Sequence, residues 1–301
     1  MEHDDSILAN YKKYDHLNEV GEPFLVKILV SYIKPSFLFK SKILTPIHLG
    51  RVVENVDSKD GVQSDEKLNW LHENCEFNDD FEGGISEHNR RIGFFTGSYW
   101  AWKNYEKLGN PKYFGNFGYR KLLDASALDN LSDYEMILPK PEHLTCPIGD
   151  QLVKFHGKSM IIAIEEAIKN IYPEELEDVH NYFAKQDGYF HELYILNKNL
   201  FFDYCAWLWP LIQFWLAFDF EKYNEQDHTV SQHYFAAVAE KRDVAFLIER
   251  ITGYYLYKLT QKHHKYKEVE VHKFFSEEFM KNFKKNMLSS IRNKLKNEAS
   301  E

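Results

Sequence analysis

The amino-acid sequence predicts an α/β protein with a mostly parallel sheet flanked by helices. Residues 24–33, FLVKILVSYI, form a continuous apolar run rich in β-branched residues, which is typical of a strand buried on both faces. Strand-like and helix-like segments alternate along the whole chain, as they do in α/β sheets. The chain has 301 residues, 44% of them hydrophobic, and is long enough to bury a large core.

The other elements are expected in the following order. A short strand is predicted at 45–50, and residues 54–84 are loop-like apart from one helix at 65–75. Helical character runs from Ser86 to Asn104 and stops before the Gly-Asn-Pro sequence at 109–111. The remaining predictions are strands at 112–119, 134–141 and 191–199 and helices at 158–170, 200–218 and 243–259.

The most apolar stretch is YCAWLWPLIQFWLAF, residues 204–218. It contains Pro210 and Gln213 and is shorter than the roughly 20 residues that a membrane-spanning helix needs. We therefore expect a buried core helix here.

Three regions are expected: a polar lead-in at 1–22, one catalytic-sized domain at 23–262 and a tail at 263–301. In the tail, apolar residues recur on one helical stripe from Phe275 to Leu295, with lysines and arginines opposite. Such a basic amphipathic helix either lies on an anionic membrane surface or packs its stripe onto the domain. The lead-in lacks the pattern of a signal peptide, so we expect a cytoplasmic location, with membrane attachment at the inner face as one option.

Several functional classes are disfavoured. A net charge of −9 argues against broad binding to a nucleic-acid backbone. The three cysteines include no Cys-x-x-Cys pair, so neither a disulfide framework nor a thiolate zinc site is expected. The sequence contains no Walker A, G-x-G-x-x-G, H-E-x-x-H or G-x-S-x-G motif. It also lacks Asp-x-Asp, and no metal ligands are assigned.

Polar residues gather where the predicted strands end. His48-Leu49-Gly50-Arg51 follows the second strand, residues 79–89 form a glycine-containing loop before a helix, and Tyr119-Arg120-Lys121 closes another strand. Glycine permits close backbone approach, and arginine suits phosphate. Ligands of open α/β sheets bind outside the carboxyl ends of the strands, so we expect these clusters to meet there.

Taken in order, the motifs resemble one family. They are KILVSYIKP, PIHLGR, DDFEGGISEHN, YWAWKN, FGYRKLL, ILPKP, HELYILNKNLFFDYCAWLWPLI and FLIER, spanning about residues 26–257. This order resembles the bacterial capsular and exopolysaccharide glycosyltransferases grouped as domain-of-unknown-function family 4422. The resemblance implies a GT-A-like fold, in which a Rossmann-type sheet binds a nucleotide sugar.

The chain also departs from the family pattern. The sequence Gly118-Tyr119-Arg120-Lys121 stands where the family has His-Tyr-Arg-Arg, and residues 82–86, EGGIS, replace Gly-Asp-Asn-Ile-Ser. His191 replaces an asparagine, and Ile33 replaces a histidine. These changes motivate an alternative, a non-catalytic nucleotide- or carbohydrate-binding relative.

From the clusters and the resemblance we assign a site. The expected catalytic residues are Glu249, as acceptor base or sugar-hydroxyl ligand, and His191, as an acceptor contact; Glu249 could equally be paired with Arg250. The expected nucleotide-sugar ligands are Ser31, His48, Gly50, Arg51, Asp80, Ser86, Asn89, Lys103, Asn104, Tyr119, Arg120, His156 and Arg250. Cationic side chains, here Arg120, Lys121, Arg51 or Lys103, would stabilise the leaving diphosphate. A divalent ion held by scattered carboxylates, with Asp80 as a candidate, stays open.

In YWAWKN, residues 99–104, helical spacing puts the aromatic side chains on different sides. We expect Trp102 to anchor the helix on the sheet and Lys103 and Asn104 to face the site.

The leading hypothesis is a hexosyltransferase that moves a sugar, with a galactose type as the candidate, from a UDP-linked donor to a saccharide or lipid-linked saccharide acceptor during surface-polysaccharide synthesis. The alternatives are the non-catalytic relative and a peripheral membrane scaffold that uses the C-terminal helix.

Overall fold

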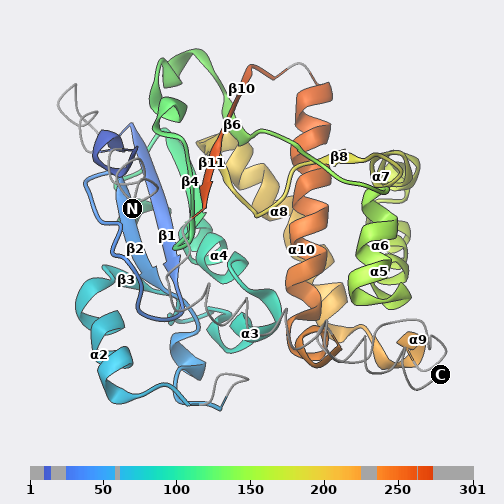
Figure 1. Cartoon of the computed structure of the whole chain (residues 1–301), viewed down its shortest axis with the longest axis horizontal. Coiled ribbons are helices and arrows are strands. Elements are labelled where there is room, and N and C mark those ends of the chain that lie inside the picture. The colour runs from blue at the N-terminus through green and yellow to red at the C-terminus, as the bar shows by residue number, and fades with distance from the viewer. Residues whose placement is uncertain (1–9, 15–24, 58–61, 225–235, 263, 274–301) are drawn as a thin grey trace, which may run out of the picture.

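The computed structural model describes residues 10–14, 25–57, 62–224, 236–262 and 264–273. A nine-stranded sheet has the order β10-β6-β9-β4-β1-β2-β3, with β5 and β11 joined beside β4 (Figure 1). The strands are β1 (Val26–Tyr32), β2 (Leu44–His48), β3 (Phe77–Asn78), β4 (Tyr113–Gly118), β5 (Lys121–Leu123), β6 (Met136–Pro139), β9 (Tyr194–Asn197), β10 (Tyr266–Val269) and β11 (Val271–Lys273). The strands β3, β2, β1 and β4 are parallel, and β9 is antiparallel to both β4 and β6.

Successive residues of β1 contribute to two separate cores, one on each face of the sheet. Leu29 packs with Ile47 and Phe114 in the larger core, whereas Ile28 and Val30 pack in the other. This alternation follows from the two-residue period of a strand. Both faces are covered, as the continuous apolar run in β1 predicts.

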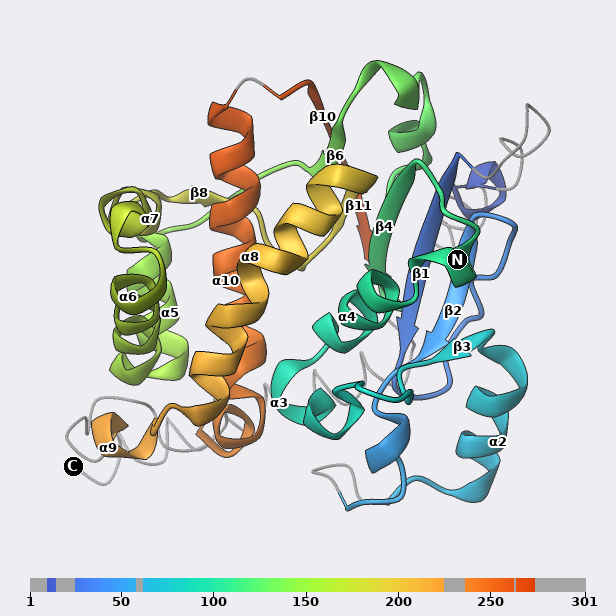
Figure 2. The same ribbon diagram turned by 180° about the vertical axis from the view of Figure 1, so that it is seen from behind.

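Helices cover the larger core. Figure 2 shows α4 and α8 on one face of the sheet, and Figure 1 shows α10 between the sheet and the group of α5, α6 and α7. The helices are α2 (Asp65–Asn74), α3 (Asn89–Ile92), α4 (Phe95–Lys103), α5 (Ile148–His156), α6 (Lys158–Ile171), α7 (Leu176–Phe183), α8 (Lys198–Ala217), α9 (Glu221–Asn224) and α10 (Ala236–Gln261). The short strands β7 (Glu142–His143) and β8 (Asp187–Gly188) pair separately.

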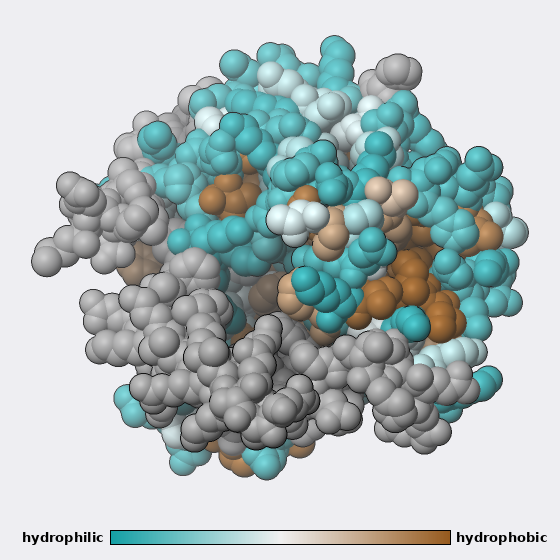
Figure 3. All heavy atoms as spheres, turned by 45° about the vertical axis from the view of Figure 1, so that its right-hand side comes forward, coloured by the Kyte–Doolittle hydropathy of each residue, from teal (hydrophilic) through white to brown (hydrophobic). Residues whose placement is uncertain are grey.

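Among the described residues, α8 is the one helix whose length and composition would suffice to cross a membrane. Part of its surface is buried in the larger core, where Trp215 Nε1 donates to the carbonyl of Ala163 at 3.0 Å. On the face drawn in Figure 3 the described surface is mainly hydrophilic, with a hydrophobic area toward its right-hand side.

The structure changes three sequence-based boundaries. The helix expected through 86–104 is broken at Gly93, whose φ of 68° is unfavourable for other residues. Residues 10–14 are helical, and the Tyr14 hydroxyl donates to the carbonyl of Leu123 at 2.5 Å, so this part of the lead-in is packed. Residues 266–273, assigned to the tail, belong to the sheet. The predicted amphipathic helix lies beyond residue 273, outside the described residues.

Candidate active site

The sheet has a topological switch point between β1 and β4. From β1 the chain runs outward through β2 and β3, then returns to the other side of β1 as β4. Backbone hydrogen bonds hold the strand ends side by side, with Leu49 N–H donating to Tyr32 O at 2.8 Å and Tyr119 N–H donating to Ser31 O at 3.2 Å. Crevices for ligands form at such switch points in open α/β sheets.

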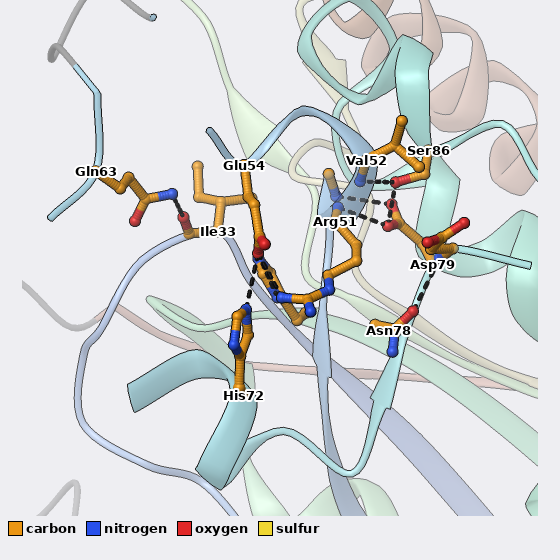
Figure 4. Close-up of polar contacts among 12 residues, drawn as sticks. Ile33, Arg51, Val52, Glu54, Gln63, His72, Asn78, Asp79 and Ser86 are labelled. Carbon is orange, nitrogen blue, oxygen red and sulfur yellow. Dashed lines mark hydrogen bonds and ion pairs between the residues drawn. The ribbon is translucent and has the colours of Figure 1, made fainter. Parts of the chain in front are cut away.

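Asp79 organises the loop that follows β2. Its carboxylate accepts the backbone N–H groups of Gly50 at 2.8 Å and Arg51 at 3.1 Å, and the Ser86 hydroxyl donates to it at 2.5 Å (Figure 4). The hydroxyl of Ser86 also accepts the N–H of Val52 at 3.2 Å. Ser86 and the backbone of Gly50 are therefore used to join two loops.

Asp80 and Asn89 occupy contrasting places in the same region. Asp80 is exposed, and its backbone N–H donates to the side chain of Asn78. Asn89 is buried and donates to Gly93 O and Thr96 Oγ1. A Cβ on Gly50, whose φ is 72°, would lie 2.8 Å from Asn89 Oδ1. Asn89 thus packs the loop beneath this edge of the sheet.

Four predicted ligands lie at the ends of β1, β2 and β4. Ser31 is buried, with its hydroxyl 3.4 Å from Asn116 Oδ1. Tyr119 is buried and stacks on Tyr32 with ring centroids 5.6 Å apart, and the Arg120 guanidinium lies 4.9 Å from the Tyr119 ring centroid. Burial lowers the pKa of His48 to about 4, so its imidazole is neutral at neutral pH.

The two predicted catalytic residues lie together. The backbone N–H of His191 donates to Glu249 Oε1 at 3.0 Å, and the ring nitrogen His191 Nδ1 lies 3.5 Å from the same oxygen. Lys121 Nζ is 2.6 Å from His191 Nδ1, and Glu142 Oε1 is 2.8 Å from His191 Nε2. Arg250 Nη1 donates to Glu249 Oε2 at 2.6 Å. We call these five residues the Glu249 cluster.

Topology brings this cluster to the switch point. Lys121 follows the tight turn at the end of β4, where it pairs with Gly118. His191 precedes β9, which runs antiparallel to β4 with Tyr194 opposite Asn116. Glu249 and Arg250 come from α10. The cluster therefore lies at the carboxyl end of β4, beside Tyr119 and Arg120.

The cluster is strongly coupled electrostatically. Burial alone would raise the pKa of Glu249, but the hydrogen bond from His191 and the charges of Arg250 and Lys121 outweigh it, and the pKa is lowered. The His191 hydrogen bond and Lys273 lower the pKa of Glu142 to about 2, against the opposing effect of burial. Burial lowers the pKa of Lys121, although Glu249 opposes this shift. Both carboxylates are ionised at neutral pH.

His156 and Arg250 extend the cluster toward α5. The His156 ring stacks on Phe246 with centroids 3.9 Å apart, and burial, together with the charge of Arg250, lowers the pKa of His156 to about 4. Arg250 Nη2 donates to Gln151 Oε1 at 2.6 Å. A neutral imidazole beside a guanidinium could contact an anionic ligand without adding a charge.

Backbone strain concentrates at the turn before β9. His191 and Glu192 have φ of 78° and 52°, in the left-handed region that non-glycine residues rarely adopt. Consecutive residues of this kind persist only where surrounding contacts impose them, and they gather at functional sites. Here the contact of the His191 N–H with Glu249 holds the turn.

Lys103 and Asn104, which were expected to face the site, lie at the far end of α4. Near the start of α4, Gly97 lies close to the carboxyl end of β1, because a Cβ on Gly97 would be 3.3 Å from Ser31 Oγ. Just after the helix, the Tyr105 hydroxyl donates to Pro111 O, shortly before β4 begins. The helix therefore runs away from the site, and Asn104 caps it by donating to Trp100 O. Lys103 Nζ lies 3.5 Å from the Trp102 ring centroid. Tyr99 and Trp100 are buried in the core, while Trp102, the expected anchor, is only partly buried.

Some site residues went unassigned in the sequence analysis. Asp79 differs from the chosen Asp80 only in register, and Glu142 stands directly after the ILPKP motif. Lys121 was expected only as one of four cations, with Arg120, Arg51 and Lys103, that could stabilise the diphosphate. A pocket of about 590 Å³ lined by Tyr182, residues 184–189 and Tyr257 contains none of the predicted site residues.

Comparisons with known proteins agree with this architecture. The structure is similar to the bifunctional glycosyltransferase WbbM in its apo form, with a TM-score of 0.62 and 22% sequence identity. The similarity covers 83% of this chain and 45% of WbbM, so the chain spans less than half of that protein. The mannosyltransferase Ktr4p of S. cerevisiae matches with a TM-score of 0.27 and 9% identity, over 70% of this chain and 71% of Ktr4p, and supports no argument.

A search of curated proteins gives no match. The similarity to WbbM shows that the fold is GT-A-like, as the resemblance implies. The profile of DUF4422, described as a domain of unknown function, matches residues 27–262, which is most of the chain. The protein therefore belongs to the DUF4422 family.

Proposed function

We propose that the protein is a glycosyltransferase that moves a hexose from a UDP-linked sugar to a saccharide or lipid-linked saccharide acceptor in bacterial surface-polysaccharide synthesis. The observation that carries the proposal is the Glu249 cluster at the carboxyl end of β4, beside the switch point of a glycosyltransferase-like fold. A galactose-type donor is the first candidate.

The leaving diphosphate needs positive charge. Arg120 and Lys121 follow β4 directly, and the ammonium of Lys121 is already paired with the cluster that would face the reacting sugar. Fixed cations beside a developing negative charge stabilise the transition state, because they need no reorganisation when the bond breaks. We assign Arg120 and Lys121 to the diphosphate, and His156 to its outer edge.

Glu249 and His191 are assigned two different roles, sugar-hydroxyl binding and acceptor deprotonation. A general base acts best when its pKa lies near the working pH, and the pKa of Glu249 is lowered. Its carboxylate is better suited to accept hydrogen bonds from sugar hydroxyls. Histidine is the residue type that most often acts as a base, so we assign acceptor deprotonation to His191. Its Nδ1 takes the proton once the Lys121 ammonium, which lies 2.6 Å from it, has turned to the diphosphate.

A panel of nucleotide sugars, assayed with acceptor extracts and with or without manganese, tests this function. We expect release of the nucleoside diphosphate from one donor, and Glu249→Gln should reduce the rate by about 100-fold or more. The control is Glu165→Gln, which removes a partly exposed carboxylate paired with His180. Binding without turnover by any donor would instead support the non-catalytic relative.

A peripheral membrane contact is a separate proposal. It rests on the basic amphipathic pattern of the C-terminal segment in the sequence. A truncated variant tests this contact. Because β11 ends at Lys273, the variant should lack only residues 274–301. Sedimentation with anionic liposomes should then be lost, and unchanged sedimentation would refute the contact.

A further inference from the structure

A second polar cluster lies beside the switch point, at the outer strands. His48 ends β2, Glu54 follows the short 3-10 helix at Arg51–Val53, and His72 lies in the last turn of α2. His72 Nε2 is 2.9 Å from Glu54 Oε2, and His48 Nδ1 is 3.8 Å from the same oxygen. Figure 4 shows Glu54, Arg51 and His72 pointing toward one another from different elements. One ligand atom from each of the two histidines and the glutamate lies within 4.8 Å of the others.

His48 is the unusual member of this cluster. Its side chain is 2% exposed, and within the described part of the chain neither ring nitrogen has a hydrogen-bond partner. A buried polar group left without a partner costs about 1–3 kcal/mol, so such groups normally have one. The carboxylate of Glu54 lies 3.8 Å from the ring, beyond hydrogen-bond distance.

We infer that His48, Glu54 and His72 form a binding site for a late first-row divalent cation, with Zn²⁺ as the representative ion. Two imidazoles and one carboxylate are a ligand set that zinc uses, whereas magnesium and calcium prefer oxygen ligands alone. With bonds of about 2.0–2.2 Å, the ligand atoms of a tetrahedral zinc lie roughly 3.4 Å apart. The separations of 2.9 and 3.8 Å lie on either side of that value, and the two histidine ligand atoms lie within 4.8 Å of each other. Side-chain movements can therefore bring the three atoms to one ion.

Access and charge also suit a cation. The side chain of His72 is 34% exposed, which opens the site to solvent, while those of His48 and Glu54 are largely buried. Three protein ligands leave one coordination position for water or a ligand oxygen, as in catalytic zinc sites. In the sequence, His48, Glu54 and His72 form no known metal-binding motif, so the folded structure is needed to bring them together.

Arg51 is the competitor for this site. Its Nη1 donates to Glu54 Oε2 at 2.6 Å, the same oxygen that His72 contacts. The Arg51 side chain is 32% exposed and can turn toward solvent when a cation takes its place. Removal of this guanidinium should therefore tighten metal binding. The inference does not depend on glycosyl transfer, because it concerns binding alone.

Calorimetric titration of the chelator-treated full chain with Zn²⁺ tests the site, and the visible spectrum with Co²⁺ reports its geometry. We expect one Zn²⁺ per chain and the absorption of tetrahedral Co²⁺. His72→Gln should weaken binding at least about tenfold, and Arg51→Gln should strengthen it. The matched control is His180→Gln, because His180 Nε2 lies 3.0 Å from Glu165 in a pair that has no third ligand among the described residues.

The substitution at the exposed His72 keeps the test valid if a His48 variant fails to fold. Absence of stoichiometric Zn²⁺ binding would overturn the inference. So would binding that is unaffected by His72→Gln, or that is weakened equally by His180→Gln.

Discussion

The backbone N–H of His191 donates a 3.0 Å hydrogen bond to Glu249 Oε1 and so ties the turn before β9 to helix α10. The two residues are 58 positions apart in the chain. Their contact places a histidine, a carboxylate and, through Lys121, an ammonium group at the end of β4.

Strain at His191 predicts an unusual order of stability. His191→Gly and His191→Ala both remove the imidazole, but only glycine adopts a φ of 78° without steric cost. The glycine variant should be the more stable by about 1 kcal/mol, measured as the free energy of unfolding in urea. Equal stability, or greater stability of the alanine variant, would show that the turn is not held in this conformation.

The buried carboxyl of Glu192 predicts a pH-dependent effect. Burial and the charge of Glu249 raise its pKa well above 4.5, so the folded protein keeps a proton that the unfolded chain loses as pH rises. Wild-type stability should therefore fall with rising pH above this ordinary value, by up to about 1.4 kcal/mol per pH unit.

Glu192→Gln lacks this titration, so its stability relative to wild type should increase as pH rises. Parallel denaturation series at several pH values measure the difference. A constant difference across the series would contradict the raised pKa.

Close packing at Gly253 holds α10 in place. A Cβ there would lie 2.3 Å from Tyr189 O and 2.5 Å from the Tyr182 hydroxyl. Gly253→Ala should destabilise the fold by about 1–3 kcal/mol, although alanine favours helix.

The control for this packing is Gly149→Ala in α5. Its nearest contact would be 3.4 Å, so this variant should gain about 0.5–1 kcal/mol. Thermal unfolding of both variants decides the point, and a stabilised Gly253→Ala would refute the packing of α10 on the β8–β9 segment.

Lys121 should bind the diphosphate. Lys121→Gln removes a charge-assisted hydrogen bond worth about 1.5–3 kcal/mol and should raise the Kd for UDP about tenfold to 100-fold. Lys169→Gln, which alters an exposed helical pair with Glu165, should leave the Kd unchanged. Calorimetry measures the Kd for UDP of both variants. Equal effects of the two substitutions would show that Lys121 does not bind the diphosphate.

Much of the fold was predictable because its signals are local. The apolar runs of β1, β2 and β4 and the helical patterns of α6, α8 and α10 appear directly in the sequence. The strands β10 and β11 were missed, because edge strands of three or four residues carry little periodic signal.

The candidate site was predictable only in part, because it depends on long-range register. The choice between Asp79 and Asp80 is decided by which carboxylate faces Gly50, and neighbouring residues of an extended chain face opposite ways. The placement of Lys103 depends on the direction in which α4 crosses the sheet. In contrast, Glu249 stood out as a carboxylate in an apolar helix, where burial requires partners.

A crystal structure of the protein with UDP would show whether the nucleotide binds beside the Glu249 cluster. We expect the diphosphate to lie at the carboxyl end of β4, within hydrogen-bond distance of Arg120 or Lys121 and next to the His191–Glu249 pair. A diphosphate bound away from this edge, for example in the pocket lined by Tyr182 and Tyr257, would contradict this expectation.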